Sequence, residues 1–232
     1  MYTVKFYKGD YVARQREANR DQAVAYVEHH FNSAASRQPG YAVVVVGSNA
    51  SQTSRNWGGW YAKEVSTHFG TGIGGDQGLL VGGWNGRGDG NLKYTDMPAV
   101  LLEPLFASNP QQADIIRSDS GQAALARLLY ESIQRFFPAG GLIAFSVGHK
   151  YKQSMPNDRG AALAGGGWEA DYAEKVLERA AALLQTSARD IDPAEGRKLR
   201  VMQGDLVLFE TAVDEDVTLV WSPERNLLSI PD

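Results

Sequence analysis

Short apolar runs alternate with longer amphipathic stretches over most of the chain. Five runs rich in β-branched or aromatic residues are predicted to be strands, at residues 1–7, 24–27, 41–46, 98–102 and 142–147. The run at 41–46 has no polar interruption, which is typical of a strand buried on both faces of a sheet.

Helical patterns separate these strands. Residues 12–22 are polar and compatible with a helix, and amphipathic patterns follow at 54–69 and 122–136. Asn109, followed by a proline, is a typical helix start, and three glycines at 165–167 precede another amphipathic helix. The apolar stripe of that helix consists of Tyr172, Val176, Leu177, Ala180, Leu183 and Leu184. Because strands and helices alternate, we predict an α/β fold with a mostly parallel, twisted sheet flanked by helices.

The pattern changes near the C-terminus. Short strand-like pieces at 206–209 and 217–221 are accompanied by turn signals such as Asp214–Asp216 and Ser222–Pro223. We therefore expect a main domain at 1–198 and a small β-hairpin extension at 199–232 that packs on it.

The composition of the chain excludes several classes of function and of active-site chemistry. The 232 residues include 23 Lys and Arg against 27 Asp and Glu, so no basic excess points to nucleic acid or to an anionic membrane. A hydrophobic content of 43% fits a globular protein. Cysteine is absent, which excludes disulfides, thiolate catalysis and cysteine-ligated metals.

The N-terminal segment has no apolar core of a signal peptide and no small-residue cleavage site. The longest apolar run, at 41–46, is far too short to span a bilayer. We expect a soluble protein that is synthesised in the cytoplasm, so that a substrate outside the cell would require another route of delivery.

Three of the four histidines and two acids stand at or near predicted strand or helix ends. His29, His30 and His149 follow strands, Glu103 ends a strand, and Glu169 opens a helix. Carboxyl ends of parallel strands form the sites of α/β folds. Two His and one Glu are a familiar ligand set of catalytic zinc, and another carboxylate could act as general base. The alternative is that each histidine is an ordinary hydrogen-bonded residue and that Glu169 complements the helix dipole. Spacing alone leaves a metallohydrolase as one possibility.

Three segments carry a family resemblance. Met97–Pro110, Arg16–Ala34, and the pair Ile143–His149 and Gly165–Glu169 resemble the zinc-dependent N-acetylmuramoyl-L-alanine amidases, which cleave peptidoglycan. The resemblance implies a single-zinc, phosphorylase-like α/β fold. Its segments stand in a different order, because the family's opening Gly-His strand follows the strand that carries the glutamate. A circular permutation accounts for this order, and the chain then begins at the usual second strand.

The resemblance assigns roles residue by residue. It implies that His149, Glu169 and His30 bind Zn²⁺ and that Glu103 activates the attacking water and then protonates the leaving amine. His30 is preferred to His29 because His30, followed by Phe and Asn, matches the family's His-x-Asn spacing. The implied partner is peptidoglycan, at its muramyl peptide stem.

Several positions depart from the family pattern. Val147 replaces a proline before Gly-His, Lys150 and Tyr151 replace a glycine pair, and Pro104 and Leu105 replace small residues after the glutamate. The segment from His149 to Glu169 is also longer than usual. These differences affect substrate contacts more than zinc binding.

Glycine is concentrated at 70–90, which predicts a long loop with one short strand at 79–81. With Trp84 and Arg87, this loop is expected to form a groove wall for glycan or peptide.

The main prediction is a zinc amidase that cleaves the bond between N-acetylmuramic acid and L-alanine and lyses cell walls, with a phage endolysin as one form that fits. Two alternatives stay open. One is an inactive relative that binds cell-wall fragments or a protein partner, and the other is a zinc peptidase acting on another amide.

Overall fold

The computed structural model describes residues 1–186, 197–203, 206–213, 220–222 and 227–229. The chain divides into two compact units, Met1–Ala188 and Arg189–Asp232, which are treated separately. The predicted sites all lie in the first unit.

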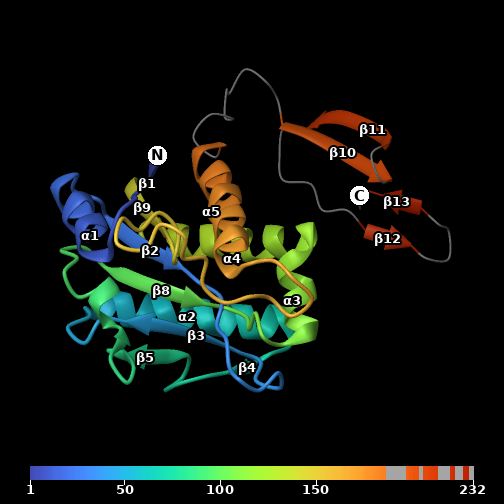
Figure 1. Cartoon of the computed structure of the whole chain (residues 1–232). Coiled ribbons are helices and arrows are strands. Elements are labelled where there is room, and N and C mark those ends of the chain that lie inside the picture. Colours follow the sequence, from blue (N-terminus) through green and yellow to red (C-terminus); the bar gives the residue numbers. More distant parts are fainter. Residues whose placement is uncertain (187–196, 204–205, 214–219, 223–226, 230–232) are drawn as a thin grey trace. The chain divides into compact units, whose positions relative to one another are not determined.

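Helices and strands alternate through the first unit, as the apolar pattern predicts (Figure 1). Its helices are α1 (Tyr11–Arg20), α2 (Gln52–Phe69), η1 (Asp89–Asn91, a 3₁₀ turn), α3 (Pro110–Arg117), α4 (Asp119–Phe136) and α5 (Glu169–Thr186). Its strands are β1 (Tyr2–Phe6), β2 (Ala25–His29), β3 (Tyr41–Val46), β4 (Gly72–Ile73), β5 (Leu79–Val81), β6 (Gly83–Trp84), β7 (Arg87–Gly88), β8 (Ala99–Glu103) and β9 (Gly141–Val147).

Seven strands form the main sheet in the order β1-β9-β2-β8-β3-β4, with β5 also paired to β3. All of these pairs are parallel except β3 with β8, so the predicted mostly parallel sheet is confirmed. β9 is the last of these strands in the chain but lies between β1 and β2. Strand β9 therefore joins β1 to β2 in the sheet, although it follows both of them by more than 100 residues in the sequence.

Both faces of the sheet are covered. On one face, alternate strand residues such as Val27 and Val44 share a core with Trp57 of α2, Leu125 of α4 and Val176 of α5. On the other face, the intervening residues pack with α1 and with the segment near η1. The apolar run of β3 contributes Val44 to one core and Val45 to the other, which explains why all of its positions are apolar.

Two sequence expectations need correction. Strand β2 continues through His29, so only His30 follows it. Residues 70–90 contain four short strands and the turn η1 rather than one strand in a loop, because tight glycine turns allow pieces of two or three residues to pair.

The described residues of the second unit form four strands in antiparallel pairs: β10 (Arg197–Gln203) with β11 (Leu206–Val213), and β12 (Val220–Ser222) with β13 (Leu227–Ser229). The turn signal at 214–216, the proline at 223 and the start of the expected strand at 217 lie outside the described residues. The packing of this extension on the main domain stays a prediction. Within the described part of the chain, no helix is long and apolar enough to cross a membrane.

Candidate metal centre and active site

Four predicted site residues meet at one edge of the sheet. His30 follows β2, Glu103 ends β8, His149 follows β9, and Glu169 is the first residue of α5. Because β8, β2 and β9 are adjacent and parallel, their carboxyl ends lie side by side. All four side chains line one cavity of about 920 Å³.

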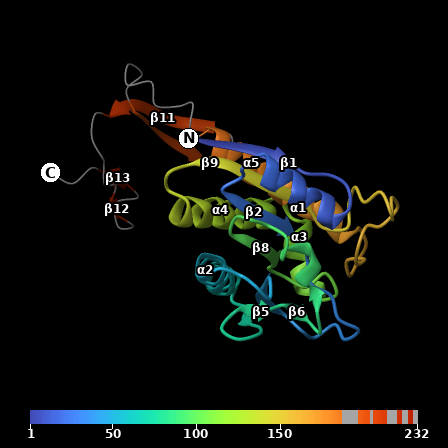
Figure 2. The same cartoon turned by 90° about the vertical axis from the view of Figure 1, so that its left-hand side faces the viewer.

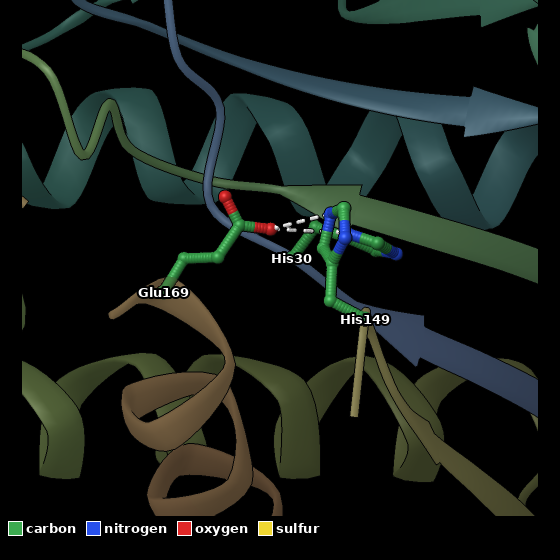
Figure 3. Close-up of side chains that lie close together, drawn as sticks. All are labelled: His30, His149 and Glu169. Atoms are coloured by element: carbon green, nitrogen blue, oxygen red, sulfur yellow. Dashed lines mark hydrogen bonds and ion pairs between the residues drawn. The ribbon is translucent and has the colours of Figure 1, made fainter. Parts of the chain in front are cut away.

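Three of these side chains converge on a common point. Glu169 Oε1 lies 3.3 Å from Nδ1 of His30 and 3.0 Å from Nε2 of His149 (Figure 3). The two imidazole rings meet edge to face, with centroids 4.8 Å apart. One donor atom from each residue lies within 4.8 Å of the others. Two nitrogens and one carboxylate oxygen fit Zn²⁺, which commonly takes three protein ligands in catalytic sites and leaves a position open.

Each histidine also contacts a second carboxylate through its other ring nitrogen. Nε2 of His30 lies 2.8 Å from Glu28 Oε1, and Nδ1 of His149 lies 3.0 Å from Asp158 Oδ2. A carboxylate on the far nitrogen fixes the tautomer and the ring orientation and leaves the near nitrogen free for a metal. The arrangement therefore selects Nδ1 of His30 and Nε2 of His149 as the metal-facing atoms.

Glu28 is fully buried, yet its carboxylate is well satisfied. Asn91 donates to Oε1 at 2.5 Å, while the hydroxyls of Ser146 and Tyr26 donate to Oε2 at 2.9 and 3.4 Å. Burial alone would raise the pKa of Glu28, but its bond to His30 and nearby positive charge bring that pKa below its usual value. Glu28 is therefore an ionised acceptor that requires a proton on Nε2 of His30.

A buried arginine holds the segment that carries His149. Arg14 donates to the carbonyl of Val147 at 2.8 Å, to the hydroxyl of Ser146 at 2.7 Å, and to the carbonyl of Lys150. The backbone of His149 has φ of 62°, a left-handed conformation that is uncommon for a residue with a side chain. These bonds on both sides of His149 stabilise that conformation, and Ser146 links the arginine to Glu28.

The glycine before His149 is required by space. A Cβ at Gly148 would lie 2.4–2.5 Å from the imidazole atoms of His30, so any larger residue would displace that ring. The Gly148–His149 pair thus supplies one histidine of the cluster and leaves the space that the ring of the other, His30, occupies.

Burial and neighbouring charge give two carboxyl groups of the cavity, those of Glu169 and Glu103, opposite pKa shifts. Burial opposes ionisation of Glu169, but hydrogen bonds with His149 and His30 lower its pKa to about 2. For Glu103, burial dominates and raises the pKa above its usual value, against the nearby positive charges of His30 and Arg87. Glu169 is thus suited to bind a cation, and Glu103 is suited to accept and return a proton.

His29 takes no part in this cluster. It is fully buried beside Phe31, with ring centroids 5.0 Å apart, and neither ring nitrogen has a hydrogen-bond partner among the residues that the structure describes. Burial lowers its pKa to about 3, so the ring is neutral. Of the two adjacent histidines, only His30 reaches His149 and Glu169.

Sequence reasoning missed three residues of this site. Glu28 stands two positions before His30, and strand alternation places residues i and i+2 on the same face, so this signal was present. Asp158 and Arg14 gave no such signal, because Asp158 lies in an irregular segment and the partners of Arg14 near His149 stand more than 130 residues later in the chain.

The sequence of the chain matches a known family. The profile of a family described as N-acetylmuramoyl-L-alanine amidase matches residues 5–135, which is more than half of the chain. The match includes Glu28, His30 and Glu103 and ends before His149 and Glu169. No curated protein matched the chain in sequence.

Solved structures of such amidases also align with the chain. The catalytic domain of CwlV from Bacillus (Paenibacillus) polymyxa var. colistinus is 22% identical, with a TM-score of 0.46, over 56% of this chain and 66% of that one. An N-acetylmuramoyl-L-alanine amidase from Clostridium difficile 630 is 17% identical, with a TM-score of 0.48, over the same shares. Ami1 from Mycobacterium smegmatis is 20% identical, with a TM-score of 0.45, over 55% and 60%. The chain spans less than two thirds of each of these structures.

Proposed function

The chain belongs to the N-acetylmuramoyl-L-alanine amidase family, and on that premise we propose that it hydrolyses the amide between N-acetylmuramic acid and L-alanine in peptidoglycan with the help of zinc. The observation that carries the proposal is the convergence of His30, His149 and Glu169 in the cavity that Glu103 lines.

Zinc held by these three side chains would polarise the scissile carbonyl and lower the pKa of a water molecule. Glu28 and Asp158 keep the two imidazoles oriented, as their hydrogen bonds require. Glu103 accepts a proton from the attacking water while the oxygen of that water bonds to the carbonyl carbon. When the C–N bond breaks, Glu103 returns that proton to the nitrogen, which leaves as the free amino group of L-alanine.

The late position of β9 and α5 supports a circular permutation of the family's chain order. These two elements supply His149 and Glu169, and β9 lies inside the sheet rather than at its edge. The amide hydrogen of Gly141 bonds to the Met1 carbonyl at 3.0 Å, and α5 packs on β1. A strand and helix that ordinarily precede β1 would occupy this place.

The site of action would be the bacterial cell wall, and a lysis enzyme of the phage endolysin type is one setting that fits. Zinc per chain, measured by elemental analysis, is the first test. We expect about one zinc in the wild type. We expect its loss in His149→Ala and its retention in the control His68→Ala, which replaces an exposed histidine at the end of α2.

Turnover is tested separately with Glu103→Gln, which keeps the size of the side chain and removes the base. We expect normal zinc content and a loss of muramoyl-alanine cleavage of at least about a hundredfold. Glu64→Gln, on α2 and outside the cavity, is the control. A fully active Glu103→Gln enzyme would reject Glu103 as base. Zinc-loaded wild type that releases no alanine amino groups from muropeptides would favour a binding protein, and cleavage of simple peptides alone would favour a peptidase.

A further inference from the structure

A small hairpin borders the cavity. Strands β6 and β7 pair directly, Trp84 opposite Arg87, and both residues line the cavity that holds the candidate metal ligands (β6 is labelled in Figure 2). Two residues that face each other across a hairpin project from the same side of the ribbon. Trp84 and Arg87 therefore present one combined surface to the cavity.

The hairpin is rigid for its size. Asn85 and Gly86 form its turn with φ of 49° and 83°, the left-handed pair that a tight type I′ turn needs. At its base, the amide of Gly82 donates to the Val46 carbonyl at 2.8 Å, and Asp89 accepts from the amide of Ser48 at 2.7 Å. A ligand that binds at the tip would cost little ordering of the backbone.

Within the described residues, the side chains of Trp84 and Arg87 have no hydrogen-bond, ionic or aromatic partner. Trp84 is 65% exposed and has no aromatic or cationic partner among the described residues. The side chain of Arg87 is exposed and, within the same described part of the chain, has no hydrogen bond or ion pair. It is also the single Lys or Arg among the described residues that line the cavity. Its charge nevertheless acts on Glu103, where it opposes the rise in pKa that burial causes.

We propose that the hairpin at 83–88 determines substrate specificity, with Trp84 stacked on a sugar ring and Arg87 paired with a carboxylate of an acidic peptide. The proposal rests on the function proposed above and names the two substrate groups that the hairpin would recognise, a sugar ring and a carboxylate.

The chemistry of each side chain fits its role. One face of a pyranose ring presents C–H groups, which pack on the apolar face of an exposed indole such as that of Trp84. A guanidinium binds a carboxylate with two parallel hydrogen bonds. The rest of the cavity is acidic, with Glu103, Asp158 and Glu169 along it, so an anionic group of the substrate is favoured beside Arg87.

The test uses the zinc-loaded full chain and three soluble substrates. These are a muramoyl dipeptide with free carboxylates, the same compound with its carboxylates amidated, and a lactoyl dipeptide that lacks the sugar ring. Trp84→Ala and Arg87→Gln are compared with Tyr94→Ala and Arg16→Gln, which replace an exposed aromatic and an exposed arginine outside the cavity. Released amino groups give kcat/KM for each pair.

Ratios of kcat/KM measure the preference of each protein for one substrate over another. We expect Trp84→Ala to reduce the preference for the sugar-bearing over the sugarless substrate about tenfold. We expect Arg87→Gln to reduce the preference for free over amidated carboxylates about tenfold, while the controls keep both ratios. Unchanged ratios in Trp84→Ala or Arg87→Gln would overturn the proposal.

A separate binding measurement distinguishes this proposal from that of hydrolysis. If the wild type cleaves none of the substrates, the proposed hydrolysis fails, and calorimetric titration with the sugar-bearing dipeptide still tests the hairpin. Binding by the wild type that weakens about tenfold in each of the two variants supports the specificity role. Binding that is absent, or equal in all proteins, contradicts it.

Discussion

His29 and His30 are neighbours in the sequence, and their environments are opposite. Both ring nitrogens of His30 face carboxylates, Glu28 at 2.8 Å and Glu169 at 3.3 Å. Both ring nitrogens of His29 are buried, and in the described part of the chain neither has a hydrogen-bond partner. The cause is the alternation of an extended chain, which turns consecutive side chains to opposite faces of the sheet.

The difference shows what distinguishes a candidate metal ligand from a core histidine in this fold. Burial, assisted by the charge of His30, lowers the pKa of His29 to about 3 and leaves its ring neutral. Burial also lowers the pKa of His30, but its bonds to Glu169 and Glu28 outweigh burial and raise that pKa well above the usual value. The acidic neighbours, and Glu28 above all, distinguish a binding site from a core position.

The largest effect is expected when each of the two histidines is replaced in turn. His30→Ala should weaken zinc binding by more than about a hundredfold, since loss of a ligand exceeds the 10–100-fold typical of its hydrogen-bond partners. His29→Leu should keep about one zinc per chain. Competition with a chelator gives both affinities, and circular dichroism confirms folding. Loss of zinc in His29→Leu with retention in His30→Ala would reverse the assignment.

The next test removes the partner rather than the ligand. Glu28→Gln keeps the shape of the side chain but removes its charge, and we expect zinc affinity to fall by about 10–100-fold. Asp158→Asn, which acts on His149 in the same way, provides the parallel case. The tautomer is an independent readout, because nitrogen NMR distinguishes Nδ1–H from Nε2–H. If Glu28→Gln leaves both the zinc affinity and the His30 tautomer unchanged, Glu28 does not position this ring.

A smaller effect concerns His29 and acid stability. Its pKa is about 3 in the folded chain against 6.5 in the unfolded chain, so between these two pH values the unfolded state binds the proton and the folded state does not. This residue should cost no stability above pH 6.5 and about 2 kcal/mol of unfolding free energy at pH 5. His29→Leu should therefore lose less stability than the wild type between pH 7 and 5. Urea unfolding with chelator present measures this difference, and parallel losses in both proteins would contradict it.

Much of the first unit follows from its sequence. Runs such as 41–46 and the stripe of α5 have unambiguous periods, and strand ends give the right places for His30, Glu103 and His149. The roles of these residues as ligands and base stay predictions.

The rest depends on contacts between distant segments. Arg14 bonds to Val147 and Asp158 bonds to His149, and in both pairs the partners are more than eight residues apart in the sequence. No local sequence pattern predicts such pairs. The hairpin at 83–88 carried a recognisable Asn-Gly turn, but the surrounding glycines favoured an irregular loop. In that segment local turn chemistry outweighed composition.

The position of β9 has a consequence for the order of events during synthesis. β1 and β2 emerge from the ribosome first, yet each pairs with β9, which follows more than 110 residues later. Until β9 is made, these two strands have open edges and no mutual pairing, and neither His149 nor Glu169 exists. Pairing over such separations is slow to nucleate. Before β9 and α5 are made, the nascent chain therefore lacks two residues of the candidate metal centre, and completion of the sheet and assembly of that centre depend on the same segment.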